Sequence, residues 1–388
     1  MHADLLIVGG GPTGLATAIH AAQRGLSTIV LDRQEPPFDK ACGESVTPLG
    51  VAALDGLGVR ASRAQAAPLA GIRLVDEEDA AEATFPFGQG LGMRRTTLMT
   101  ALVARAEDLG VTLRFGVEVG GWVDHGDRVT LATSRGSCDG RWLVGADGLH
   151  SRVRRMAGLA LPSRGRPRFG MRRHFATAPW SEFLEIHWGD DVEACVTPTG
   201  PAEIGVTLLW SGGGDFETVL ARVPALHARL AAVRPLDAAR GAGPMRQRAR
   251  RRHVGNVVLV GDAAGYVDPL AGEGLTLGLR AAAALVDVLA HGRPLAAYER
   301  AYRRLARSHE LVPRLLLAAA GRPALRRRVI AALARTPESF GRLLGVACGQ
   351  TAIRSLGPIH AARLAWEIAR GGHPGAPDRH AALPTPRA

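Results

Sequence analysis

The feature that most constrains this 388-residue chain is a glycine-rich turn that joins an apolar segment to a helical pattern near its start. The apolar run Asp4–Val8 leads directly into a G-x-G-x-x-G spacing, and an alanine-rich helical pattern comes next. A strand, a tight glycine turn and a helix in this order form the dinucleotide-binding unit of a parallel α/β sheet, where the helix N-terminus faces a pyrophosphate. The predicted site residues in this turn are Gly9, Gly11, Pro12, Thr13 and Gly14.

A second apolar segment supports the same prediction. Thr28–Leu31 is a short strand-like run that ends at Asp32, about 20 residues beyond the glycines, where such units carry an acid for the ribose hydroxyls. We therefore expect Asp32 to bind an adenosine ribose, with Arg33 beside it. The whole segment predicts a nucleotide site in the first strand–helix–strand unit of the chain.

Composition excludes several other classes of protein. The net charge of +12 is carried almost entirely by arginine, Lys40 is the only lysine, and no nucleic-acid-binding motif accompanies the charge, so we expect no nucleic-acid partner. The four cysteines form no C-x-x-C, which predicts neither a metal site nor a redox-active disulfide and fits a reducing, cytoplasmic setting. We find no signal-peptide pattern and no apolar run of about 20 residues, and hence predict no transmembrane segment.

Two later motifs, taken with the first glycine motif, resemble those of a known family. A strand-like segment ends in Gly145-Ala146-Asp147-Gly148 and runs on to Arg154, and a later one ends in Gly261-Asp262. With the first glycine motif, these resemble, in order and separation, the FAD-dependent monooxygenases related to p-hydroxybenzoate hydroxylase. That superfamily also includes geranylgeranyl reductases and flavin-dependent halogenases. The resemblance covers about Asp4 to His291.

The resemblance implies a fold and a domain arrangement. We expect an α/β protein whose Rossmann-like FAD-binding domain has a parallel sheet and is interleaved with an antiparallel-sheet substrate domain, followed by a helical C-terminus. The expected FAD-binding domain is residues 1–165 and 245–295, and the substrate domain is 72–92 and 166–244. Residues 296–372 form the helical region, and 373–388 are expected to be disordered. Single helices are expected at Asp215–Val233, Leu295–Ser308 and Glu310–Ala320.

The resemblance also implies further FAD-binding residues. Arg95, which opens a helix with Leu98, Leu102 and Ala106 on one face, fits the family's FAD-contacting arginine better than Arg94 does. The turn from Pro269 to Thr276 is expected to present backbone N–H groups to the flavin's pyrimidine edge, where a helix N-terminus stabilises the charge of reduced flavin. The additional predicted residues are Cys42, Gly43, Arg95, Asp147, Gly148, Gly261, Asp262, Pro269, Gly272, Glu273, Gly274 and Leu275.

Within the superfamily the sequence favours one activity and leaves an alternative. The first expectation is a monooxygenase that uses NAD(P)H and O₂, through a flavin C4a-hydroperoxide, to hydroxylate an aromatic, polyketide-like or lipid-like secondary metabolite. The loop Lys40–Glu44 resembles that of geranylgeranyl reductase-like proteins, which keeps reduction of prenyl-type C=C bonds as the alternative. A halogenase is disfavoured because no W-x-W-x-I-P motif is present, and a flavoprotein without turnover is a further alternative.

Several assignments remain open in the sequence. No catalytic residue is assigned, and His174, His187, Trp188 and Trp210 are only candidates for lining a substrate pocket. The C-terminal helices alternate apolar stripes with arginine faces, a pattern that leaves peripheral contact with a membrane surface open. Oligomeric state and the identity of the substrate are not specified.

Overall fold

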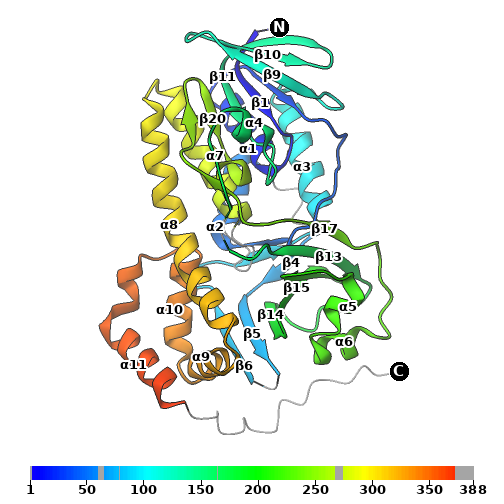
Figure 1. Ribbon diagram of the computed structural model, residues 1–388, viewed down its shortest axis with the longest axis vertical. Coiled ribbons are helices and arrows are strands. Elements are labelled where there is room, and N and C mark those ends of the chain that lie inside the picture. The colour runs from blue at the N-terminus through cyan, green and yellow to red at the C-terminus, as the bar shows by residue number, and fades with distance from the viewer. Residues whose placement is uncertain (1, 60–64, 78, 164, 267–273, 372–388) are drawn as a thin grey trace.

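The computed structural model describes residues 2–59, 65–77, 79–163, 165–266 and 274–371. A mainly parallel sheet forms the upper part of the molecule (Figure 1). Its first strand lies at the centre and is buried on both faces, which explains why its sequence is a continuous apolar run. Its strands in spatial order are β19 (His253–Val254), β20 (Val257–Leu259), β11 (Gly136–Gly145), β1 (His2–Val8), β2 (Thr28–Leu31) and β8 (Thr112–Arg114).

Helices cover this sheet, and a hairpin extends it. β9 (Val119–Asp124) and β10 (Val129–Thr133) continue antiparallel from the first half of β11, at the top of Figure 1. Apolar side chains of the helices and strands form one buried core. The helices of this half are α1 (Pro12–Ala22), α2 (Pro48–Leu57), α3 (Arg95–Asp108), the short α4 (Arg152–Met156), the 3-10 turn η2 (Gly261–Ala264) and α7 (Gly274–Ala290).

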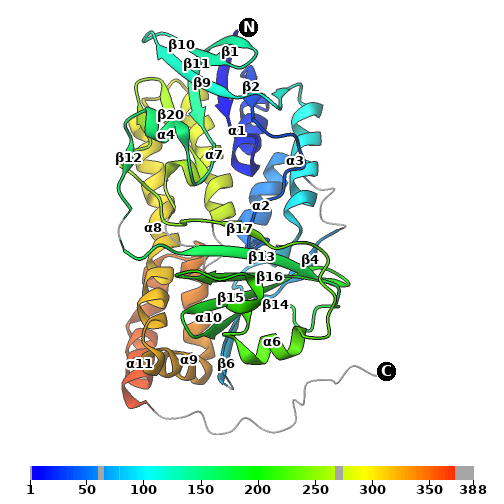
Figure 2. The same cartoon turned by 45° about the vertical axis from the view of Figure 1, so that its right-hand side comes forward.

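A second, largely antiparallel sheet forms the lower half, and Figure 2 shows it crossing beneath the first. Only the β14–β5 pair is parallel among its described strands. Its strands in spatial order are β17 (Arg240–Ala242), β13 (Phe169–Phe175), β16 (Glu203–Trp210), β15 (Val192–Gly200), β14 (Phe183–Gly189), β5 (Gly71–Asp76) and β6 (Asp79–Thr84). Two smaller sheets contain β3 (Ser45–Val46), β7 (Gly90–Gly92) and β4 (Ala67–Leu69), and β12 (Ala160–Leu161) with β18 (Arg248–Ala249).

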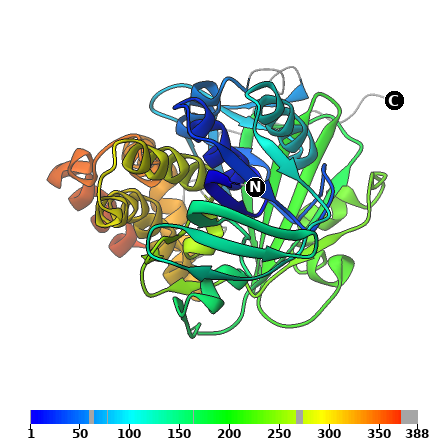
Figure 3. The same ribbon diagram turned by 90° about the horizontal axis from the view of Figure 1, so that it is seen from above.

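The C-terminal helices pack beside both halves. α8 (Leu295–Ala320) runs along the side of the molecule from the upper to the lower sheet, and Figure 3 shows it beside α7. α9 (Pro323–Arg335) and α10 (Pro337–Ala347) bury apolar side chains against β5, β6 and β14. η3 (Ile353–Leu356) and α11 (Gly357–Arg370) end the described chain.

A buried ion pair fastens the C-terminal helices to the second sheet. Arg326 of α9 donates Nε–H to one carboxylate oxygen of Asp76 at 2.8 Å and Nη2–H to the other at 2.9 Å. The Asp76 side chain is fully shielded from solvent. Because one carboxylate accepts two donors in a fixed fork, the pair sets the orientation of α9 relative to β5.

The expected fold class is confirmed, with two differences in the helices. The single helix expected at 215–233 is two helices, α5 (Phe216–Leu220) and α6 (Pro224–Leu230). Val223 precedes a proline, and its backbone angles (φ −120°, ψ 77°) are not helical, so the two helices are not continuous. The two helices expected at 295–308 and 310–320 are one, α8, since no helix-ending signal stands between them. The expected domain limits stay a prediction, and residues 373–388 lie outside the described part.

Candidate functional site

A cavity of about 660 Å³ lies where the two sheets meet. Four parallel strands of the upper sheet contribute residues at or just beyond their carboxyl ends, namely Val8, Leu31, Ala146 and Val260. Open α/β sheets bind ligands at this edge, because the loops that succeed the strands converge there. The opposite wall comes from the second sheet, so residues far apart in the chain share one chamber.

The glycines of the first turn serve two different purposes. A Cβ on Gly14 would lie 1.9 Å from the carbonyl oxygen of Gly9, so Gly14 allows α1 to pack closely on the end of β1. A Cβ on Gly9 would lie 2.4 Å from the carbonyl oxygen of Ala146, so Gly9 allows the chain to approach closely just beyond β1 and β11. A Cβ on Gly11 would meet nothing nearer than Nη2 of Arg95, at 3.8 Å. Gly11 lines the cavity, so the absence of a side chain there is not required by packing within the protein and instead leaves space for a ligand.

Asp32 connects the end of β2 to the glycine turn. One oxygen of its carboxylate accepts a hydrogen bond from the Gly10 N–H at 2.8 Å, and the other accepts from the Gln34 N–H at 2.9 Å. These bonds fix the carboxylate at the cavity wall while leaving further lone pairs on its oxygens. Its position suits the acceptance of hydrogen bonds from ribose hydroxyls.

Asp147 caps the short helix α4 and leaves one oxygen unused. Its Oδ2 accepts from the N–H groups of Arg152 and Val153, at 2.7 and 3.1 Å. Its Oδ1 is buried and has no hydrogen-bond partner within the described part of the chain, although the residue lines the cavity. A buried acceptor without a partner costs about 1–3 kcal/mol, so this atom fits a hydroxyl donor from a bound ligand.

Arg154, further along the same motif, is buried and holds the loop of Asp262 in place. Its guanidinium donates to the carbonyl oxygens of Asp262 and Ala263 at 3.2 and 3.0 Å, and to that of Leu149 at 2.6 Å. It also donates to Gln247 at 2.8 Å. The arginine therefore ties the Asp147-Gly148 motif to the Gly261-Asp262 motif, a positioning role that the motif spacing alone does not reveal.

Opposite charges surround Asp262 in the cavity. Burial raises the pKa of Asp262, while the positive charges of Arg95, Lys40 and Arg154 act in the opposite direction. Burial and the charge of Arg95 lower the pKa of Lys40, whereas the negative charges of Asp32 and Asp262 partly offset this by raising it. Nε of Arg95 is buried and has no partner among the described residues. A cationic pair, an unused donor and an open glycine backbone together fit an anionic pyrophosphate flanked by hydroxyl-bearing groups.

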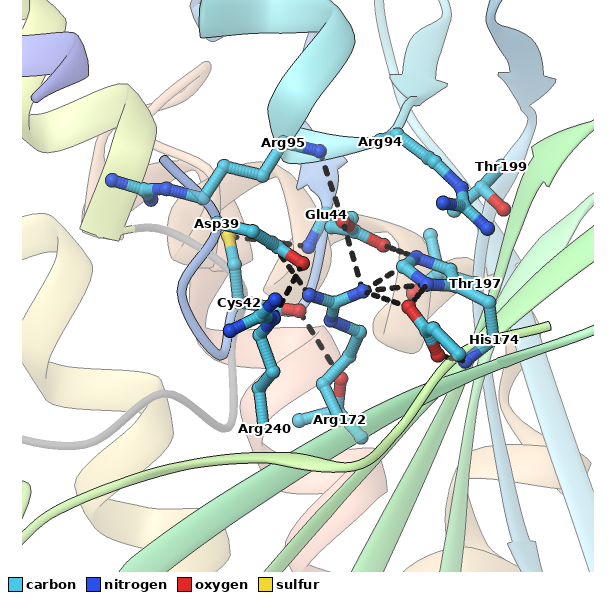
Figure 4. Close-up of polar contacts among 12 residues, drawn as sticks. Asp39, Cys42, Glu44, Arg94, Arg95, Arg172, His174, Thr197, Thr199 and Arg240 are labelled. Atoms are coloured by element: carbon cyan, nitrogen blue, oxygen red, sulfur yellow. Dashed lines mark hydrogen bonds and ion pairs between the residues drawn. The ribbon is translucent and has the colours of Figure 1, made fainter. Parts of the chain in front are cut away.

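The loop before β3 is held against the second sheet by a buried ionic cluster, shown in Figure 4. Arg172 donates Nη2–H to Asp39 at 2.6 Å and Nη1–H to Asp237 at 3.1 Å. Glu44, with the positive φ of 58°, accepts from the Arg95 N–H at 2.9 Å and contacts Nε2 of His174 at 2.6 Å. The cluster joins the loop, the first turn of α3 and β13.

His174 lies between two carboxylates in this cluster. Its Nε2 faces Glu44, and its Nδ1 lies 2.7 Å from Oδ2 of Asp237. Burial alone would lower the pKa of His174, but the hydrogen bond and charge of Glu44 and the hydrogen bond of Asp237 outweigh it and raise that pKa above 6.5. When His174 is protonated, it donates to both carboxylates and neutralises charge that burial would otherwise penalise.

The cavity wall contributed by the second sheet and its neighbours is less polar than the nucleotide end. Its lining includes Gly170, Thr207, Leu209, Gly241 and Met245. Thr207 donates to the carbonyl oxygen of Cys42 at 3.3 Å, which holds the Cys42 loop against this wall. This end offers an apolar surface next to a loop backbone, which suits a largely apolar molecule.

Comparison with known proteins identifies the family. Residues 2–201 and 212–301 match the model of the FAD binding domain family. The chain belongs to this family. It is 30% identical over 315 residues to menaquinone reductase of Mycobacterium tuberculosis, covering 74% of this chain and 76% of that protein. It is 30% identical over 328 residues to 3-demethoxyubiquinol 3-hydroxylase of Escherichia coli, covering 75% and 80%.

A solved structure shows the same fold across nearly the whole molecule. A flavoprotein/dehydrogenase from Cytophaga hutchinsonii superposes with a TM-score of 0.81 at 18% identity, covering 95% of this chain and 98% of that one. The family and the named relatives together place this FAD-binding protein among the FAD-dependent oxidoreductases, as the sequence predicts.

The structure brings fourteen of the nineteen residues predicted for FAD to the wall of one cavity. Gly14 does not line it and serves helix packing, and Gly261 lies behind Thr13, whose Oγ1 is 2.8 Å from the position of an added Cβ. Pro269, Gly272 and Glu273 lie outside the described residues. Binding of FAD by each individual residue remains a prediction. The fourteen are Gly9, Gly11, Pro12, Thr13, Asp32, Arg33, Cys42, Gly43, Arg95, Asp147, Gly148, Asp262, Gly274 and Leu275.

The candidates for a substrate pocket are placed elsewhere. Within the described chain, His174, His187, Trp188 and Trp210 do not line the cavity. His187 contacts Glu185 at 2.9 Å, and both tryptophans belong to buried apolar clusters. In their place, the cavity wall includes residues that sequence reasoning did not select. These are chiefly Lys40, Glu44, Trp122, Arg152, Arg155, Leu209 and Met245.

Metal sites and membrane spans are both missing from the described residues. No cluster of histidine, cysteine or acidic residues in that part of the chain has the arrangement of a metal site. Among the described helices, none is both long and apolar enough to cross a membrane.

Proposed function

We propose that this protein is an FAD-dependent monooxygenase that uses NAD(P)H and O₂ to hydroxylate an aromatic or lipid-like secondary metabolite. The observation that carries the proposal is the shape of the cavity. A polar, partly cationic end built from the nucleotide motifs continues into a less polar end bounded by Leu209 and Met245. Such a chamber suits one molecule with a pyrophosphate and a second that is apolar and flat.

The chain's own residues would bind, orient and shield the reactants. The open backbone at Gly11 and the cation Arg95 would hold the pyrophosphate of FAD, and Asp32 and Asp147 would accept hydrogen bonds from hydroxyl groups. When bound, FAD would supply hydride acceptance and the activation of O₂. The wall around Leu209 would keep water from the substrate ring, which protects an oxygen-transfer reaction from wasteful side reactions.

The hydroxylase among the relatives supports this choice, since its name specifies attack on a quinol ring. Menaquinone reductase, named for reduction rather than hydroxylation, supports a second candidate, a flavin-dependent reductase, for which the reduction of a prenyl-type C=C bond stays the expected reaction. The position of Cys42 favours that candidate too, because its loop resembles that of the reductase branch and lines the same cavity. In both reactions this cavity would hold FAD, which would supply the electrons when bound. They differ in whether its electrons pass to O₂ or to a C=C bond.

One experiment separates the two candidates. The FAD-loaded protein is incubated with NADPH or NADH and a panel of alkylated phenols, hydroquinones and menaquinone, in parallel under heavy-isotope O₂ and under nitrogen. A product that carries one heavy oxygen atom and forms only with O₂ supports the monooxygenase. A product whose prenyl chain, rather than its quinone ring, gains two hydrogens under nitrogen supports the reductase and refutes our proposal. If neither NADPH nor NADH reduces the flavin in the presence of any of the compounds, the protein is a flavoprotein without turnover.

A further inference from the structure

The last helix carries its large apolar residues on the outside of the molecule. In α11, Ile359 is 78% exposed and Trp366 is 56% exposed, and none of the helix residues is buried. A surface helix normally turns its apolar stripe inward and its polar stripe toward water. The outward face of α11 reverses this arrangement, which calls for a partner.

The helix cannot simply rotate to bury this face. Its inward side is fixed by Glu367, which accepts a hydrogen bond from Nε of Arg335 in α9 at 2.6 Å, and by Leu364, which packs on the core beneath. The exposed positions of α11 form a continuous arc, with Arg363 and Arg370 at one border. The exposed apolar positions are Pro358, Ile359, Ala361, Ala362, Ala365, Trp366 and Ala369.

Two neighbouring segments also expose large apolar side chains. Ile353 in η3 is 60% exposed, and Phe87 in the loop after β6 is 65% exposed. Gln350 donates its side-chain N–H to the carbonyl oxygen of Phe87 at 2.5 Å, which holds that loop beside the segment leading into η3. We call Phe87, Ile353, Ile359 and Trp366 the C-terminal apolar face. It contains four of the six large apolar side chains that are exposed among the described residues.

The charge around this face is almost entirely positive. Residues 322–371 contain nine arginines and two glutamates, and no lysine or aspartate. Both glutamates already have partners, since Glu367 pairs with Arg335 and Glu338 pairs with Arg342 at 3.1 Å. The guanidinium of Arg370 lies 5.0 Å from the centre of the Trp366 ring. Arg326 and Arg327 are neutralised from outside the segment by Asp76 and Glu77, whereas Arg363 and Arg370, at the border of the exposed apolar arc, form no ion pair among the described residues.

We propose that the C-terminal apolar face docks on the surface of a bilayer that contains anionic phospholipids. Tryptophan and aliphatic side chains on a helix that lies flat enter the headgroup boundary, while arginines reach outward to phosphates. A second copy of the chain fits less well, because a two-fold contact would place the same arginines against one another. The α11 helix is at the lower left of Figure 1, on the side away from the upper sheet. The inference goes beyond the proposed function, since it does not depend on the reaction catalysed.

The test is sedimentation of the full-length protein with vesicles. Vesicles of phosphatidylcholine alone are compared with vesicles containing one third phosphatidylglycerol, at low and high salt. We expect binding to the anionic vesicles that weakens at high salt, because salt screens exposed charges. The variants I359S/W366S and R363E/R370E should each bind at least about tenfold more weakly, because the first removes apolar side chains from the headgroup boundary and the second reverses charges that an anionic surface attracts.

A matched control makes the same kinds of change at the other end of the molecule. Val123, 57% exposed, and Arg128, half exposed, lie on the β9–β10 hairpin, so V123S/R128E should bind vesicles like the unmodified protein. No binding of the unmodified protein to anionic vesicles would overturn the proposal. Equal loss in the control would also overturn it, because attraction would then reflect total charge. A dimer in gel filtration that I359S/W366S dissociates would assign the face to a second copy instead.

Discussion

Replacing Gly11 with valine should remove FAD binding and leave the fold intact. The backbone at Gly11 has φ −69° and ψ 176°, an extended conformation that valine readily adopts. The nearest atom to an added Cβ is Nη2 of Arg95 at 3.8 Å, which is ordinary contact. Valine is a poorer N-cap for α1 than glycine, so we expect the free energy of unfolding of the apo protein to fall by about 1 kcal/mol or less. The valine methyl groups would instead occupy cavity space that a pyrophosphate needs.

The size of the effect on binding depends on the hydrogen bonds that the valine would obstruct. A hydrogen bond from a backbone N–H to a charged phosphate contributes about 1.5–3 kcal/mol. Loss of two such bonds would weaken FAD binding by at least about a hundredfold. Gly14→Ala is the matched control in the same turn, because its Cβ would lie 1.9 Å from a backbone oxygen of Gly9. That substitution should cost about 1–3 kcal/mol or more of stability.

Two measurements check this pair. Urea unfolding followed by circular dichroism gives the stability of each apo protein, and quenching of flavin fluorescence gives the dissociation constant of FAD. The reasoning is refuted if Gly11→Val binds FAD as tightly as the unmodified protein. It is equally refuted if Gly14→Ala is as stable as the unmodified apo protein, because Gly14 would then not be required for the packing of α1.

Three further predictions concern the buried charges. Arg326→Met should cost about 3–5 kcal/mol because it leaves the carboxylate of Asp76 buried and unpaired, whereas R326M/D76L should recover most of that loss in urea unfolding. Stability from His174 is complete below its ordinary pKa of 6.5 and is lost as pH rises through the raised pKa, so the Tm should fall above about pH 6.5 and His174→Gln should flatten that slope. Arg154→Met should weaken FAD binding while Arg154→Lys restores part of it, measured by the same titration, because lysine satisfies some of the carbonyl oxygens.

Local signals were enough for the nucleotide half of the molecule. The turn at Gly9–Gly14, the acid at Asp32 and the strand before Asp262 are each specified by neighbouring residues, because strand, turn and helix within about 35 residues form one packing unit. The periodicity of α3 also favoured Arg95 over Arg94 for FAD contact, which stays a prediction. Arg95 faces the cavity, whereas Arg94 turns away to Glu203 at 2.6 Å.

The remainder of the site depends on contacts between distant parts of the chain. Glu44 meets His174 across 130 positions, and no periodic pattern encodes that meeting. The same holds for Leu209 and Met245, whose sequence pattern is that of ordinary core residues and which line the cavity only because the second sheet packs against the first. The outward arc of α11 gives the same amphipathic pattern as an inward one, so periodicity cannot decide which side faces water.

The central place of β1 has a consequence for how the chain folds during synthesis. His2–Val8 pairs with Gly136–Gly145, which in turn pairs with Val257–Leu259, so the sheet cannot be completed until about two thirds of the chain has left the ribosome. Pairings this distant make folding slow, and until they form β1 and β2 present open edges to other chains. The cavity lining ends at Leu275, so FAD would meet its full site only after that strand order is complete. Supply of FAD would then raise the yield of folded protein as well as its activity, because FAD binds only the folded state and so stabilises it against unfolding.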